Sequence, residues 1–171
     1  MRSLIAVGLA VAQVAVTSAP GDRYFGRLKM SALRIRYETM QLKKRYENHD
    51  LLPDQTLHLV LLTEDAYAQW AQQYPKDSWL PSTGYALAQL YGELPGAQAR
   101  DHAVALLTYV KSHFPKTAYA TLSRNQLHRG VAVKPYPAWA SATPRPQLPA
   151  TPTLAPTMMP SASPAPTRSP A

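Results

Sequence analysis

The chain contains no cysteine and only seven glycines among its 171 residues. Without cysteine it has no disulfide framework, no thiolate nucleophile and no thiolate metal site, so cysteine usage does not indicate a compartment. The glycines are scattered, and Gly84, Gly92 and Gly96 flank or interrupt a predicted helix instead of following a strand. The sequence therefore lacks a glycine-rich phosphate-binding loop.

Catalytic constellations are missing as well. No histidine stands four residues from a second histidine with a carboxylate between them, so the sequence has no His-Glu-x-x-His zinc site. Glu64 and Asp65 are adjacent on a predicted helix and do not face each other, which indicates a solvated edge and not a catalytic pair. Ser123 lacks the flanking glycines of a nucleophile elbow. We expect no enzymatic activity, no cofactor and no metal.

The positive charge is confined to one segment. The formal net charge is +8, yet residues 22–49 hold eight Lys or Arg against three acids, whereas residues 50–133 hold six against seven. The basic character therefore belongs to one predicted helix and not to the whole molecule.

The carboxyl-terminal segment has the composition of a disordered tail. Residues 135–171 contain 11 of the 17 prolines, nine Ser or Thr and no acidic residue. Such a composition buries too little apolar surface to offset the entropy of ordering. We expect a disordered tail over 134–171 that acts as a spacer, with a proline-motif ligand or an O-glycosylated stalk as alternatives.

The amino-terminal residues 1–19 have the form of a secretory signal peptide. Arg2 precedes an apolar run, Leu4–Val16, and the small residues Val16 and Ser18 precede a cleavage point at Ala19. As a helix, this segment reaches about 24 Å, which is short of the hydrocarbon core of about 30 Å. We expect an exported protein, periplasmic or secreted. An uncleaved membrane anchor and a buried helix are the alternatives.

Hydrophobic periodicity predicts about five helices over residues 22–133. Asp22 is placed to cap the first, Pro53 stands at the start of the second, Pro95-Gly96 stops the third, and Thr117 caps the fifth. The predicted ranges are 22–48, 54–74, 84–94, 97–114 and 117 to about 129. The fold class is therefore all-α, built from antiparallel helical hairpins.

The predicted first helix, Asp22–Asn48, carries two apolar stripes on nearly opposite sides. One stripe consists of Met30, Leu33, Tyr37 and Met40, and the other of Tyr24, Leu28, Ile35, Leu42 and Tyr46. The second helix can cover only one of them. The other is expected to meet the later hairpins or a second copy of the chain, which would make a homo-oligomer.

Two basic edges lie between the stripes and form a candidate site for an anionic partner. They consist of Arg23, Arg27 and Arg34 on one edge, and of Lys29, Arg36 and Lys43 on the other. An anionic membrane surface or a cell-envelope polymer fits their closeness to the amino-terminal segment. Nucleic-acid motifs are absent, and charges on two edges disfavour nucleic acid as the partner.

A phrase near the middle of the chain occurs twice. Tyr74-Pro75-Lys76 and Phe114-Pro115-Lys116 each close an amphipathic run, 40 residues apart. Repetition at this period in helical sequence is typical of stacked helix hairpins.

Residues around the second phrase resemble the tetratricopeptide repeat, in the variant of bacterial periplasmic and outer-membrane assembly proteins. The matching positions are Leu87, Ala88 and Tyr91 on one helix, and Ala103, Leu107, Val110 and Pro115 on the next. The loop inside this unit is about three residues longer than is usual, and the first hairpin is oversized for the family. The likeness covers about 75 residues of the chain.

This resemblance implies a short α-solenoid that acts as a protein-interaction scaffold. The concave surface of such an array is lined by the first helix of each hairpin, which carries the resemblance over to Ser82, Tyr85, Gln89 and Glu93. A protein or peptide partner is then expected at these residues, with Tyr85 as the main anchor because aromatic residues dominate binding hot spots. The alternative is a basic helical module for anionic lipid, envelope polymer or nucleic acid.

Overall fold

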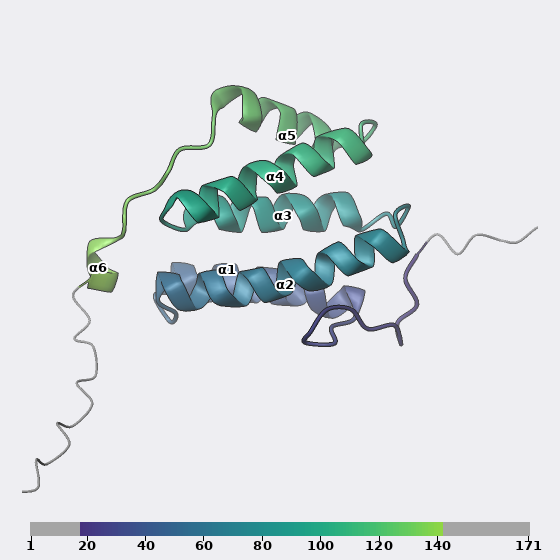
Figure 1. The fold of residues 1–171 in the computed structure, drawn as a ribbon, viewed down its shortest axis with the longest axis horizontal. Coiled ribbons are helices and arrows are strands. Elements are labelled where there is room, and N and C mark those ends of the chain that lie inside the picture. The colour runs from purple at the N-terminus through teal and green to yellow at the C-terminus, as the bar shows by residue number, and fades with distance from the viewer. Residues whose placement is uncertain (1–17, 142–171) are drawn as a thin grey trace, which may run out of the picture.

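Residues 18–141 are described by a computed structural model, and their regular structure is helical, with no strand in that range (Figure 1). Two antiparallel hairpins, α1 with α2 and α3 with α4, are followed by α5, which packs on α4 and α3. The predicted class of all-α helical hairpins is confirmed. The helices are α1 (Ala32–Glu47), α2 (Pro53–Gln73), α3 (Leu80–Glu93), α4 (Ala97–His113), α5 (Ala118–Arg129) and the short α6 (Ala138–Ser141).

The start of α1 differs from the prediction. The helix begins after Ser31, whose Oγ accepts a hydrogen bond from the Arg34 N–H at 3.3 Å, and not after Asp22. Phe25 and Met30 instead exchange backbone hydrogen bonds of 2.8 and 2.9 Å, which fold residues 25–30 into a turn. Gly26 has a φ of +68° in this turn, a conformation that glycine adopts without strain.

This shorter helix has one covered face. Ile35 and Leu42 are fully buried, whereas Leu33 and Met40 remain 63% and 62% exposed. The later hairpins therefore leave the stripe of Leu33 and Met40 uncovered, and cover by a second copy of the chain stays a prediction. Tyr24 and Leu28 precede the helix and belong to no helical stripe. We call the exposed residues Leu33, Tyr37 and Met40 the outer stripe.

The later helices follow the prediction closely. Pro53 is the first residue of α2, and Thr117 caps α5 by accepting a hydrogen bond from the Ala120 N–H at 3.2 Å. α3 begins at Leu80, one turn earlier than predicted, because Pro81 fits the first turn of a helix. None of the helices in residues 18–141 is long and apolar enough to cross a membrane.

The repeated phrase has the same local structure at both places. Tyr74 ends α2 with φ −130° and ψ 60°, and Phe114 ends α4 with φ −125° and ψ 49°. Each carbonyl then accepts a hydrogen bond of 3.0 Å from the N–H three residues on, that of Asp77 or Thr117. The repeated phrase thus has the same local conformation at both places.

The core lies between the two layers of helices. In Figure 1, α1 and α3 lie behind α2 and α4, and fully buried side chains of all four helices fill the space between them. Tyr91, Leu107 and Val110 are all fully buried, as expected for the contact between α3 and α4. The centre of the first hairpin is Trp70, which packs on Phe25 and Tyr67.

After α5, the chain returns to the first hairpin along one end of the helices (Figure 1). The Gly96 N–H donates to the Lys134 carbonyl at 3.0 Å, and the Tyr136 hydroxyl donates to Asp54 at 3.3 Å. The Trp139 ring stacks on His49 with centroids 4.2 Å apart. Residues 130–141, which we call the strap, therefore pack on the domain, and the predicted tail boundary at 134 lies too early. The rest of the predicted tail and residues 1–17 lie outside the described residues.

Candidate binding face on α3

The four residues carried over from the repeat resemblance share one side of α3. Ser82, Tyr85, Gln89 and Glu93 follow each other at intervals of three and four residues, and each is half-buried. α1 and α5 both pack beside α3. We call these four residues the α3 face. It combines a closed polar half with an open aromatic half.

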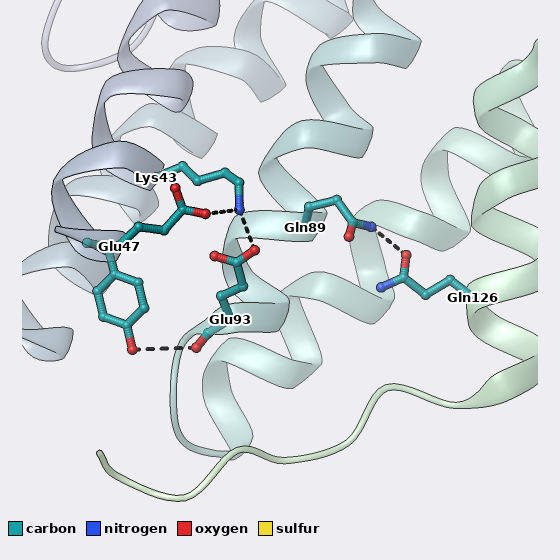
Figure 2. A network of polar contacts seen from close by, with 6 residues as sticks. Lys43, Glu47, Gln89, Glu93 and Gln126 are labelled. Atoms are coloured by element: carbon teal, nitrogen blue, oxygen red, sulfur yellow. Dashed lines mark hydrogen bonds and ion pairs between the residues drawn. The ribbon is translucent and has the colours of Figure 1, made fainter. Parts of the chain in front are cut away.

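The closed half links three helices through polar contacts (Figure 2). Lys43 of α1 forms ion pairs with Glu93 of α3 and with Glu47 at 2.7 Å. Burial lowers the pKa of Lys43, but the hydrogen bonds to Glu47 and Glu93 outweigh it, so the pKa is raised. Gln89 donates to Gln126 of α5. These side chains bind one another and are therefore less available to a partner.

The open half carries aromatic and apolar groups. The Tyr85 ring lies 5.8 Å from the ring of Tyr119 on α5. Trp79 is 42% exposed just before α3, and the Arg36 guanidinium sits 4.3 Å above its ring, a distance typical of a cation–π contact. A shallow depression of about 90 Å³ separates α1 from α3 here, between Met40 and Arg36 on one side and Ser82, Thr83 and Ala86 on the other.

The six basic residues predicted to bind an anion do not share one helix, although Lys29 and Arg34, which were assigned to different edges, line the same hollow. Arg23, Arg27 and Lys29 precede α1, so the two predicted helical edges do not exist. Three of the six are engaged by acids near them: Arg27 lies 3.8 Å from Asp65, Arg34 lies 3.1 Å from Glu38, and Lys43 forms the ion pairs described above. Arg36 and Lys43 are the two that the fold brings beside the α3 face.

A larger hollow lies elsewhere in residues 18–141, between α2 and α4. This groove of about 480 Å³ is mainly apolar, with Tyr67, Ala71, Leu106 and Tyr109 among its lining residues. The Tyr67 hydroxyl is not free, because it donates to the Leu80 carbonyl at 3.0 Å.

A polar cluster beside this groove was missed by the sequence analysis. Glu64 accepts a hydrogen bond of 2.6 Å from the Tyr91 hydroxyl and lies 2.8 Å from His102 Nδ1. Its neighbour Asp65 instead contacts Arg27. Glu64 therefore belongs to an internal polar cluster and not to the solvated edge that the sequence predicted for both acids. Burial and the bond to Glu64 raise the pKa of Tyr91, which has no exposed surface and therefore acts as a neutral internal donor. The sequence did not indicate that Glu64 binds Tyr91 and His102 while Asp65 binds Arg27.

Within residues 18–141, no three His, Asp or Glu side chains gather as metal ligands would. Comparison with protein-family models, with curated proteins and with solved structures found no match to the chain.

Proposed function

We propose that the protein is a protein-interaction scaffold of helical hairpins resembling tetratricopeptide repeats, and that it binds a segment of a partner protein on the open half of the α3 face. The observation that carries this proposal is the neighbourhood of Tyr85. Its half-buried ring lies beside the ring of Tyr119 on α5, and the exposed Trp79 directly precedes α3. Ser82 of the same face lines, together with Met40 of α1, a shallow depression that no side chain fills. Aromatic side chains held on a rigid helix are the usual anchors of protein interfaces.

The chemistry of the open half indicates the kind of segment bound. Met40, Trp79 and Tyr85 offer contact to an apolar or aromatic side chain. Arg36 is half-buried above Trp79 and can receive a carboxylate through its guanidinium N–H groups. The proposed ligand is therefore a peptide segment that presents an apolar anchor next to an acidic residue.

The alternative function, binding of an anionic lipid, envelope polymer or nucleic acid, has less support. Arg27, Arg34 and Lys43 are already paired with acidic side chains of the protein. Arg23 and Lys29 are exposed, Arg23 before the turn of residues 25–30 and Lys29 within it. A polyanion would have to compete with the internal pairs or rely on few cations.

The proposed place of action is outside the cytoplasm, in the periplasm or the medium, because residues 1–19 have the pattern of an export signal. Retention by an uncleaved anchor is the variant of this proposal that the same residues allow.

The binding face is tested with a photo-crosslinking amino acid at position 85, and at position 24 as the matched control. Tyr24 is also an exposed tyrosine, but it precedes the turn of residues 25–30 and lies outside α3. We expect cross-links to a distinct partner from position 85 only. Affinity for that partner, measured by calorimetry, should fall about tenfold or more in Tyr85→Ala, as for an interface hot spot.

Salt separates the two candidate functions. Contacts of an apolar anchor weaken little between 50 and 200 mM salt, whereas phosphate binding weakens steeply over this range. Equal cross-linking from positions 24 and 85, or a steep loss of affinity with salt that Tyr85→Ala does not change, would contradict the proposed face.

A further inference from the structure

Asp77, in the loop between α2 and α3, is a buried carboxylate. It is only 3% exposed and accepts three hydrogen bonds. Its Oδ2 receives the Trp70 indole N–H at 3.0 Å and the Ala19 N–H at 2.9 Å, and its Oδ1 receives the Trp79 N–H at 3.0 Å. A group that accepts three bonds and donates none behaves as an ionised carboxylate.

The charge of this carboxylate has no partner of opposite sign among residues 18–141. None of the ion pairs of this part of the chain includes Asp77. Neutral N–H donors compensate a buried charge only in part, because removal of a carboxylate from water is costly unless a cation accompanies it. A positive charge at one of the three donors would complete the site.

Ala19 is the donor that can acquire such a charge. Its nitrogen immediately follows Ser18, and Val16 and Ser18 are the small residues that an export peptidase requires before its cut. Ser18 is exposed, so the bond that follows it is accessible to an enzyme. An α-amino group has an ordinary pKa of about 8 and is therefore mostly protonated at neutral pH.

We propose that a signal peptidase cleaves the chain between Ser18 and Ala19, and that the new α-ammonium group of Ala19 forms a buried ion pair with Asp77. Water adds across the Ser18–Ala19 amide, the C–N bond breaks, the carboxylate leaves with Ser18, and the amine of Ala19 takes up a proton. The nitrogen already lies 2.9 Å from Oδ2, so the pair needs no rearrangement.

The neighbouring contacts hold the new terminus in place. Ala19 packs against the hydrophobic core, and the Arg23 N–H donates to the Pro20 carbonyl at 3.1 Å, which closes a turn directly after it. Asp77 itself belongs to the first copy of the repeated phrase, whose second copy has Thr117 at the same place. The carboxylate thus occurs only in the first copy of the phrase, which is the copy that lies beside Ala19.

This inference rests on the proposed export and is independent of the proposed partner. In the first experiment, the full chain is produced in an exporting bacterium, and the amino terminus of the recovered protein is read by mass spectrometry. We expect a chain that begins at Ala19. A chain that retains Met1, or one that begins at another residue, would overturn the proposal, while binding at Tyr85 could still be observed.

The second experiment tests the ion pair. One glycine is inserted between Ser18 and Ala19, so that cleavage after Ser18 leaves a neutral peptide N–H at Ala19 and moves the ammonium group away. We expect a melting temperature lower by about 5 °C or more, because a buried charge loses its partner while the hydrogen bond remains. The same insertion in an Asp77→Asn background should have no effect.

Two results would refute the ion pair. Equal melting temperatures with and without the inserted glycine would show that the amine contributes nothing, and this comparison leaves Asp77 intact, so it does not depend on folding of Asp77→Asn. If the inserted glycine lowers the melting temperature equally in the protein with Asp77 and in Asp77→Asn, the cause would be crowding and not loss of the charge pair.

Discussion

At the scale of single residues, close approach of helices explains one of the two glycines on α3. Gly84 on α3 faces the Tyr67 hydroxyl of α2 and the Val110 side chain of α4, so a Cβ at this position would stand only 2.9 Å from Val110 Cγ2. Gly92 lies on the same helix, and a Cβ there would meet nothing within 4 Å. The two glycines therefore lie on the same helix, but only Gly84 lacks room for a Cβ.

We predict that Gly84→Ala lowers the free energy of unfolding by about 1 to 3 kcal/mol, because the added methyl overpacks a filled contact. Gly92→Ala should instead raise it by about 0.5 to 1 kcal/mol, since alanine loses less entropy than glycine in a helix. Urea unfolding of the two variants measures both values. Equal effects of the two substitutions would be inconsistent with the three-helix contact at Gly84.

Two buried tyrosine hydroxyls set a limit on stability at alkaline pH. Burial raises the pKa of Tyr67 and of Tyr91, and the bond to Glu64 raises that of Tyr91 further. The folded state therefore favours the protonated form. Their contribution to stability is fully present below pH of about 10, the ordinary pKa of tyrosine, and is lost as the pH rises above it.

We predict that these two of the ten tyrosines do not ionise with exposed tyrosines in a spectrophotometric titration, and ionise only when the protein unfolds. The free energy of unfolding should fall above pH of about 10, and Tyr91→Phe should reduce the slope of this fall. Full ionisation of all tyrosines while the helical circular dichroism is intact would contradict the burial of both hydroxyls.

At the scale of elements, helices with local signals were predicted well and the first one was not. Pro53 and Gly130 mark helix ends through their backbone conformations and Thr117 through its side-chain hydroxyl, and α2 and α5 have the expected bounds. The turn before α1 depends on α2 instead. The Gly26 N–H donates to Gln69 at 3.0 Å and the Arg27 N–H to Asp65 at 3.0 Å, contacts that no local pattern encodes.

The candidate site also has a part that was predicted from the sequence and a part that was not. The resemblance to the tetratricopeptide repeat implied Ser82, Tyr85, Gln89 and Glu93, and these four residues lie on one side of α3. Which neighbours they meet depends on how far α1 and α5 slide and rotate against α3. The pairs of Glu93 with Lys43 and of Arg36 with Trp79 therefore could not be read from the sequence.

The two sides of α1 should respond differently to a charge. We predict that Ile35→Glu unfolds the protein or costs about 3 kcal/mol or more, since it buries an unpaired charge. Met40→Glu, on the outer stripe, should leave the helical circular dichroism unchanged. If the outer stripe joins two copies, sedimentation will show a dimer that Met40→Glu dissociates; a monomer in both proteins would exclude that contact.

At the scale of the whole molecule, the strap connects α5 to the first hairpin. Trp139 stacks on His49 and lies 5.9 Å from the Tyr46 ring, and Ala140 is buried. We predict that Trp139→Ala lowers the free energy of unfolding by about 1 to 3 kcal/mol through lost apolar burial.

Deletion of residues 144–171 should leave the melting temperature unchanged, because their composition predicts no packed face. A drop of several degrees on that deletion would show that the tail packs on the domain.

The strap also changes how the array is expected to open. In a linear stack, each unit contacts only its neighbours, so the terminal units fray first and unfolding can proceed in steps. Here the chain beyond α5 is fastened to the turn after α1 by the stacking of Trp139 on His49, and to the loop after α3 by the bond between Gly96 and Lys134. Fraying of either terminal element would have to release these contacts as well. Amide hydrogen exchange in α1 and α5 should therefore be about as slow as in α3, as in a single cooperative unit.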